Sequence, residues 1–195
     1  MIVIIDNGHG KLTPGKRSPD GTHLEYKWAR MFAKKLQQQL EQNNISTQLL
    51  VPETKDIPLN TRVARANHYT LNTKHTLLIS IHNNAAGADG KWHEARGWQV
   101  CIANNASQNS KTLATVIAKE IKQMDIKLRV PTPTQHYWQQ NLAICRDTKC
   151  PAILTENLFM DNKEDLQLLK DPQTIDKLLY AHTNGILKYI KQIEK

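Results

Sequence analysis

The chain has 195 residues, of which 39% are hydrophobic and 23% charged, and its formal net charge is +8. These values are ordinary for one globular domain and exclude a disordered chain, and no apolar run approaches the roughly 20 residues of a membrane-spanning helix. The positive charge favours an anionic partner, such as nucleic acid, anionic lipid or a bacterial wall polymer. Because no Lys/Arg run with interleaved aromatic residues occurs, we expect no specific nucleic-acid binding.

Short apolar runs alternate with amphipathic stretches along the chain. In chain order we predict a strand at 2–5, a helix at 24–42, a strand at 47–51, a helix at 59–69, strands at 76–81 and 98–103, a helix at 111–124, strands at 142–145 and 152–155, and a helix at 172–193. Such alternation predicts a twisted, mostly parallel sheet with helices on both faces. No repeat or linker interrupts it, so we expect one α/β domain over residues 1–195.

The chain has three cysteines, Cys101, Cys145 and Cys150. An odd number without regular spacing does not describe a disulfide framework, and the absence of a Cys-x-x-Cys motif argues against a thiolate zinc site. Because Cys101 and Cys145 fall in predicted strands, we expect buried free thiols. A disulfide that joins Cys145 to Cys150 is the alternative.

Three titratable residues stand at the ends of apolar runs. His9 lies in the turn Asn7-Gly8-His9-Gly10 after the first strand, His82 follows the strand at 76–81, and Glu156 follows the strand at 152–155. In a mostly parallel sheet, ligands bind beyond the carboxyl ends of the strands. We therefore expect the three side chains to share a cleft, although His9 alone is more typical of a turn histidine, His82 alone is more typical of a core histidine, and a carboxylate such as Glu156 can be a buried ion-pair member.

A zinc hydrolase usually needs a third protein ligand in addition to two histidines. Glu25 is the candidate, because it begins the first predicted helix on the face of Trp28 and Phe32, where a carboxylate is costly to bury unless it is paired or bound to metal. His23 is a rival ligand, and a first-turn glutamate favoured by the helix dipole is the alternative without metal. Glu156 then fits a general base that later acts as a general acid.

The ordered motifs resemble those of the zinc-dependent N-acetylmuramoyl-L-alanine amidases often called the amidase-3 family. The matching segments are Asp6-Asn7-Gly8-His9-Gly10, Glu25, Arg62, Ala66-Asn67, Ser80-Ile81-His82-Asn83-Asn84, Gly97, Pro151 to Glu156, and Phe159-Met160-Asp161-Asn162. They cover essentially the whole chain in the family's order. Asn7 replaces the usual proline and Lys11 the usual second glycine, and neither is a ligand. Asn157-Leu158 replaces a small or apolar residue and glycine, which we expect to alter the substrate groove.

The resemblance implies zinc held by His9, Glu25 and His82, with Glu156 as the catalytic acid–base. The implied reaction is hydrolysis of the amide between N-acetylmuramic acid and L-alanine, so the expected partners are peptidoglycan and muropeptides, and we expect a monomer. Action on the bacterial wall, in the periplasm or outside the cell, follows. The residues after Met1 do not form a signal peptide. Two routes stay open: a phage-type lysin exported or released from the cytoplasm, and a wall-remodelling enzyme whose leader was removed.

Two other functions also stay open. A zinc carboxypeptidase or deacetylase would use the same ligands on another wall amide, and a decayed module would only bind the wall. Some family members carry a helical insertion after the Ser-Ile-His segment that covers the metal until a partner removes it. Here twelve residues separate Asn84 from Gly97, which favours a loop over a stable helix. We expect an open enzyme that needs no activator, with Trp92 or His93 as substrate contacts or as plain loop residues.

Overall fold

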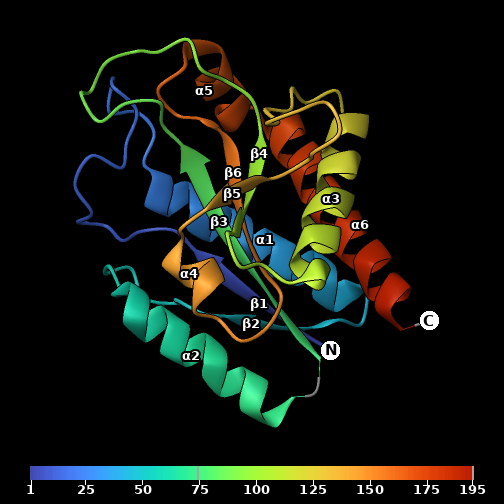
Figure 1. The fold of residues 1–195 in the computed structure, drawn as a ribbon. Coiled ribbons are helices and arrows are strands. Elements are labelled where there is room, and N and C mark those ends of the chain that lie inside the picture. The colour runs from blue at the N-terminus through green and yellow to red at the C-terminus, as the bar shows by residue number, and fades with distance from the viewer. Residues whose placement is uncertain (74, 195) are drawn as a thin grey trace.

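The apolar runs of the sequence form a six-stranded sheet in the order β2-β1-β3-β6-β4-β5, with helices on both faces (Figure 1). This computed structural model describes residues 1–73 and 75–194. In chain order the elements are β1 (Ile2–Asn7), α1 (Glu25–Gln42), β2 (Ser46–Leu49), α2 (Leu59–Asn72), β3 (Thr76–Asn84), β4 (Gln99–Ala103), α3 (Gln108–Gln123), β5 (Trp138–Gln140), α4 (Ala143–Arg146), β6 (Ala152–Phe159), α5 (Lys163–Lys170) and α6 (Pro172–Ile193).

Most strand pairs of the sheet are parallel. β1 pairs in parallel with β2 and β3, β3 with β6, and β4 with β5, whereas β4 runs antiparallel to β6. Because β2 and β3 flank β1 on opposite sides, the order of the chain reverses at β1. A crevice at such a point, beyond the carboxyl ends of the strands, is where open α/β sheets bind ligands.

Two apolar cores sandwich the sheet. The larger core packs α1, α3 and α6 against one face, and Trp28, Phe32 and Ile117 are among its buried residues. The smaller core packs α2 and α4 against the other face, around Ile4 and Leu154. The predicted mostly parallel α/β fold with helices on both faces is confirmed. Of the helices in the described part of the chain, none combines the length and apolar character that crossing a membrane requires.

The predicted strand at 142–145 is wrong, because this run forms the short helix α4. The N–H groups of Cys145 and Arg146 both donate to the carbonyl oxygen of Leu142, at 3.0 and 2.8 Å, which closes a helical turn. A four-residue apolar run carries too little periodicity to separate a strand from a helix. Cys145 therefore lies in a helix, and the three cysteines are free thiols, so the alternative disulfide between Cys145 and Cys150 is not formed.

Strand β6 extends beyond the predicted strand at 152–155. His82 pairs with Glu156, but Asn84 pairs with Phe159, so β6 contains one additional residue at a β-bulge. Leu158 lies in this bulge with a φ of 67°. Glu156 consequently lies inside the strand and not after it. The sequence also did not predict the short strand β5 or helix α5, whose first turn is capped by the Asn162 side chain.

Candidate metal centre and active-site cleft

Three candidate ligands from distant parts of the chain meet at the carboxyl end of the sheet. His9 follows β1, Glu25 begins α1 and His82 lies near the end of β3. One donor atom from each lies within 4.8 Å of the other two. Glu25 Oε1 is 3.0 Å from His82 Nδ1, and Glu25 Oε2 is 3.4 Å from His9 Nε2. The structure thus brings together the three residues that the sequence singled out as metal ligands.

The Gly-His-Gly turn has an unexpected conformation. His9 itself adopts the left-handed conformation, with a φ of 56°, which histidine tolerates better than most residues. The two neighbouring glycines allow other groups of the protein to approach the backbone closely. A Cβ at Gly8 would lie 2.5 Å from the His82 ring, and a Cβ at Gly10 would lie 2.1 Å from the backbone N of Asp56. Glycine is therefore needed at both positions because other groups pack directly against the backbone.

Arg62 fixes this turn from the side of α2. Its side chain is 4% exposed and donates hydrogen bonds to the carbonyl oxygens of Asn7 and His9, at 2.7 and 3.3 Å. It also pairs with the carboxylates of Asp6 and Asp56, at 2.8 and 3.2 Å. The sequence marked Arg62 only as a motif match. Its role was not predictable, because its contacts with Asp6, Asn7 and His9 join positions more than 50 residues apart.

Glu25 has the properties of a metal ligand. Its carboxylate is fully buried, and Oε1 accepts hydrogen bonds from the backbone N–H of Asn83 and from His82, whereas Oε2 has no hydrogen-bond partner. Burial alone would raise the pKa of Glu25, but the hydrogen bond from His82 and the nearby positive charges outweigh it and lower the pKa. A buried carboxylate oxygen without a partner, facing two imidazoles, fits a divalent cation, and two nitrogens with one oxygen suit zinc.

The pKa values of the two histidines shift in opposite directions. Burial lowers the pKa of His9 to about 4, against the opposing effect of Glu25. Burial also acts to lower the pKa of His82, but the hydrogen bond to Glu25 and the neighbouring carboxylates raise it overall. His9 is therefore neutral at physiological pH, with a ring lone pair available for a metal ion.

Glu156 lies beside the candidate ligands on the neighbouring strand. It is the register partner of His82, so both side chains leave the same face of the sheet. Its Oε2 is buried and has no hydrogen-bond partner. Burial raises the pKa of Glu156 to about 7. A carboxyl group with such a pKa can both accept and release a proton near neutral pH.

The rival ligand His23 and Asn157, which departs from the family pattern, both hydrogen-bond to Asn83. His23 Nε2 is 2.8 Å from Asn83 Oδ1 and does not join the cluster of donor atoms, which supports Glu25 over His23. The side chain of Asn157 donates to the His82 carbonyl and accepts from the Trp98 indole. Asn157 and Leu158 are both buried. Any effect of these two residues on the groove would therefore be indirect, and this expectation stays a prediction.

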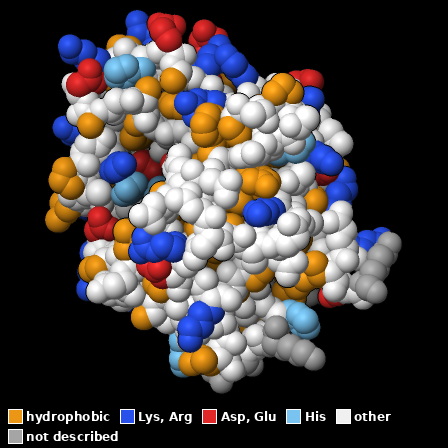
Figure 2. Space-filling view, viewed as in Figure 1, with side chains coloured by type: hydrophobic (Ala, Val, Ile, Leu, Met, Phe, Trp, Pro, Cys, Tyr) orange, Lys and Arg blue, Asp and Glu red, His pale blue; other side chains and the backbone are white. Residues whose placement is uncertain are grey.

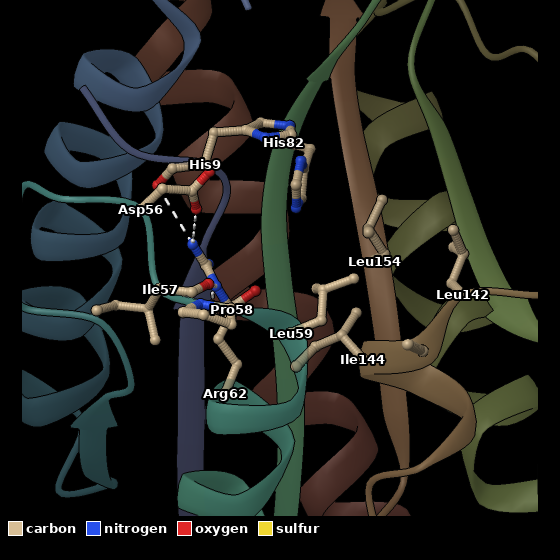
Figure 3. Close-up of a pocket in the computed structure, with 12 residues that line it drawn as sticks. His9, Asp56, Ile57, Pro58, Leu59, Arg62, His82, Leu142, Ile144 and Leu154 are labelled. Carbon is tan, nitrogen blue, oxygen red and sulfur yellow. Dashed lines mark hydrogen bonds and ion pairs between the residues drawn. The ribbon is translucent and has the colours of Figure 1, made fainter. Parts of the chain in front are cut away.

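A cavity of about 570 Å³ opens beside His9 and His82. Its lining is largely apolar and comes from the start of α2, from α4 and from β6. Figure 3 shows Leu59, Ile144 and Leu154 below His82, while Asp56 and Arg62 lie below His9. Figure 2 shows a hollow in the same face of the molecule, where histidine, acidic and basic side chains gather. The candidate centre is therefore open to a ligand.

The loop of residues 85–97 does not cover the centre. It contains no helix, and it is held against the segment that follows β6. Asp161 Oδ2 accepts the backbone N–H groups of Ala86 and Gly87, and Asp165 Oδ2 accepts that of Gly97. The backbone N–H of His93 donates to the Asp161 carbonyl. Neither Trp92 nor His93 lines the cavity beside the metal centre.

Comparison with known proteins adds independent observations. The sequence pattern of the family Amidase_3, N-acetylmuramoyl-L-alanine amidase, matches residues 3–188. The chain is 31% identical over 122 residues to the endolysin of Bacillus phage SPP1, which covers 63% of this chain and 43% of the endolysin. It is 28% identical over 187 residues to the sporulation-specific N-acetylmuramoyl-L-alanine amidase of Bacillus subtilis (strain 168), which covers 94% of this chain and 66% of that protein.

A solved structure agrees over nearly the whole fold. The crystal structure of N-acetylmuramoyl-L-alanine amidase from Clostridium difficile 630 superposes with a TM-score of 0.83 at 26% identity, covering 97% of this chain and 96% of that one. The chain spans less than two thirds of the length of the two curated relatives named above. Because the family pattern extends over residues 3–188, the chain belongs to the Amidase_3 family of N-acetylmuramoyl-L-alanine amidases.

Proposed function

We propose that the protein hydrolyses the amide between N-acetylmuramic acid and L-alanine in peptidoglycan, using zinc held by His9, Glu25 and His82. The observation that carries this proposal is the fully buried carboxylate of Glu25, whose Oε2 atom has no hydrogen-bond partner and faces two imidazoles. A second buried carboxyl oxygen without a partner, Oε2 of Glu156, belongs to the neighbouring strand. Membership of the Amidase_3 family supports the choice of substrate. When bound, zinc supplies a Lewis acid that polarises the scissile carbonyl and lowers the pKa of water.

Glu156 is the residue that we assign to proton transfer. It accepts a proton from the attacking water as the water oxygen bonds to the carbonyl carbon. It then donates a proton to the nitrogen as the C–N bond breaks, which leaves a lactyl carboxyl group and the free amine of L-alanine. The pKa of about 7 suits both steps. Because Glu156 and His82 are register partners, the acid–base group and the ligand set keep a fixed spacing.

Residues 1–195 would form a single catalytic domain that acts on the wall as a monomer. Two other functions compete with this one. A zinc peptidase or deacetylase would act on a different amide of the wall, and its products differ. A module that only binds the wall needs no general base, so the preserved Glu156 beside the ligand cluster disfavours it.

Product analysis tests the proposal. Purified peptidoglycan is digested with the protein, with and without a chelator, and the products are identified by mass spectrometry. We expect a free lactyl carboxyl and a new L-alanine amine, loss of activity with the chelator and recovery with zinc. Glu156→Gln should keep about one zinc per chain and lose about 10²- to 10⁴-fold in turnover, the usual contribution of a general acid–base. His82→Ala should lose zinc and activity together.

Four results would contradict the proposal. Cleavage at another amide would indicate the peptidase or deacetylase. Full activity of metal-free protein would exclude the zinc assignment. Zinc loss in Glu156→Gln, with activity regained on zinc addition, would show that Glu156 is a ligand and not the acid–base. Release of zinc by His23→Ala but not by Glu25→Ala would replace Glu25 with His23 in the ligand set.

A further inference from the structure

One side of the metal centre is unsuited to an anionic group. The apolar cavity has two carboxylates in its lining, Asp6 and Asp56, and Arg62 is the one cation among its lining residues. Arg62 already pairs with both carboxylates, at 2.8 and 3.2 Å, and is 4% exposed. Apart from His9 and His82 at the metal centre, the charged groups that an anion would meet in this cavity are two carboxylates and a guanidinium already paired with both of them. The cavity therefore suits a neutral group with apolar surface.

The loop of residues 10–24 provides a cation at the centre. Lys16 lies in this loop, and its carbonyl oxygen accepts the backbone N–H of Glu25 at 3.1 Å, which holds Lys16 next to the ligand set. Its side chain is half-buried, and Lys16 takes part in none of the ion pairs formed by the described residues. Burial and the charged groups of the site have the larger effects on the pKa values of His9, Glu25 and Glu156, and the Lys16 ammonium acts to lower all three. Lys16 thus combines proximity to the centre with a charge that no ion pair neutralises.

The loop is anchored, so Lys16 is held in place before a substrate arrives. The N–H of Lys11 donates to the Thr54 carbonyl at 2.8 Å, and the Thr13 hydroxyl donates to Asp56 at 2.5 Å. A hollow of about 190 Å³ between this loop and the loop of residues 85–97 has Arg17, Lys91 and Asp161 in its lining. Its two basic residues outnumber its one acidic residue, so positive charge continues along the same loop beyond Lys16.

We propose that Lys16 binds a carboxylate of the stem peptide, so that the stem lies along the 10–24 loop and the glycan side of the scissile amide lies toward the apolar cavity. This assignment rests on the proposed function. The stem residue after L-alanine carries an α-carboxyl group that is either free or amidated. Only the free form offers a negative charge to Lys16, so the enzyme selects unamidated stems.

The test compares two disaccharide tripeptides that differ only in this group, one with glutamate and one with isoglutamine at the second stem position. We expect the zinc-loaded wild type to give a kcat/KM about 3- to 10-fold higher on the free acid, the range of a partly exposed charge pair. In Lys16→Met this ratio should fall to about one, mainly through KM. Lys16→Arg, which keeps the charge, should retain most of the preference, and added salt should reduce it in the wild type.

Lys11→Met is the matched control, because Lys11 lies in the same loop but is exposed. It should keep the wild-type ratio, and all variants should keep the wild-type zinc content. A ratio that stays unchanged in Lys16→Met overturns the assignment. If kcat/KM then falls equally on both probes, Lys16 acts on the charges of the site itself and not on the stem carboxylate. Cleavage of neither probe by the wild type overturns the proposed function and the assignment together.

Discussion

Individual residues hold the candidate ligands in place through close packing of the backbone around His9 and His82. Gly8 is in contact with the His82 ring, and Gly10 is in contact with the backbone of Asp56. The left-handed backbone of His9 costs of order 1–3 kcal/mol unless the surroundings stabilise it. The hydrogen bonds from Arg62 to the carbonyl oxygens of Asn7 and His9 provide such support. The ligand geometry thus depends on groups that bind no metal themselves.

Gly8→Ala should therefore weaken zinc binding about 10- to 100-fold, the range found when groups that orient ligands are lost. The new Cβ, 2.5 Å from the His82 ring, must push that ring away. Zinc affinity measured by competition with a chelator tests this. Gly15→Ala is the control for a glycine substitution away from the centre: unlike Gly8, Gly15 has a positive φ of 71°, and it has no atom within 4 Å of its Cβ position. Equal zinc affinity of Gly8→Ala and wild type would contradict the prediction.

At the scale of elements, helix α6 buries a histidine that takes no part in the proposed chemistry. The His182 ring packs edge-to-face against Phe32 and Trp98, with ring centroids 5.2 and 5.9 Å apart. Its Nδ1 donates to the Leu178 carbonyl at 2.7 Å, while Nε2 is buried without a partner. Burial lowers the pKa of His182 to about 4. The folded protein therefore holds this ring neutral within the larger core.

This histidine should make the fold sensitive to acid. In the unfolded chain its pKa is about 6.5. Between pH 6.5 and 4 the unfolded state takes up the proton and the folded state does not, so the contribution of His182 to stability is full above pH 6.5 and is lost as the pH falls. His182→Asn keeps a donor for Leu178 and removes this proton. The stability gap between wild type and variant should shrink by about 2 kcal/mol from pH 7 to 4.5.

Urea unfolding of both metal-free proteins at several pH values measures this gap. Metal-free protein is needed because zinc binding also depends on pH. A gap that stayed constant over this range would show that His182 titrates equally in the folded and unfolded states.

At the scale of the whole molecule, the cleft is open. The loop of residues 85–97 lies against the segment after β6, held by Asp161 and Asp165. A loop with buried acceptors for its backbone N–H groups has little freedom to move over the metal centre. Access of substrate to the cleft therefore does not require a conformational change of this loop.

We accordingly expect the purified, zinc-loaded protein to turn over soluble muropeptides without any partner. A turnover assay with this protein alone measures it, and Glu156→Gln serves as the inactive blank. Activity that appeared only after addition of a second protein, or after shortening of the 85–97 loop, would refute the expectation.

Much of this architecture is readable from the sequence, because the central strands are buried on both faces and so appear as apolar runs. The candidate ligands were found for the same reason: His9 and His82 come soon after the largely apolar runs 2–5 and 76–81. The short helix α4 was missed, since four apolar residues have no distinctive period. The sequence also did not predict the ion pairs of Arg62, the bulge at Leu158 or the position of Lys16, because each depends on contacts between distant segments.

The three free thiols have a consequence for where the chain can fold. Burial raises the pKa of Cys101 to about 12 and of Cys150 to about 11, and it raises the pKa of Cys145 as well. Thiolates are the reactive form in oxidation and in disulfide exchange, so all three sulfurs are poorly reactive. The native fold therefore requires neither an oxidant nor a disulfide isomerase, and it is chemically the same in a reducing and in an oxidising compartment.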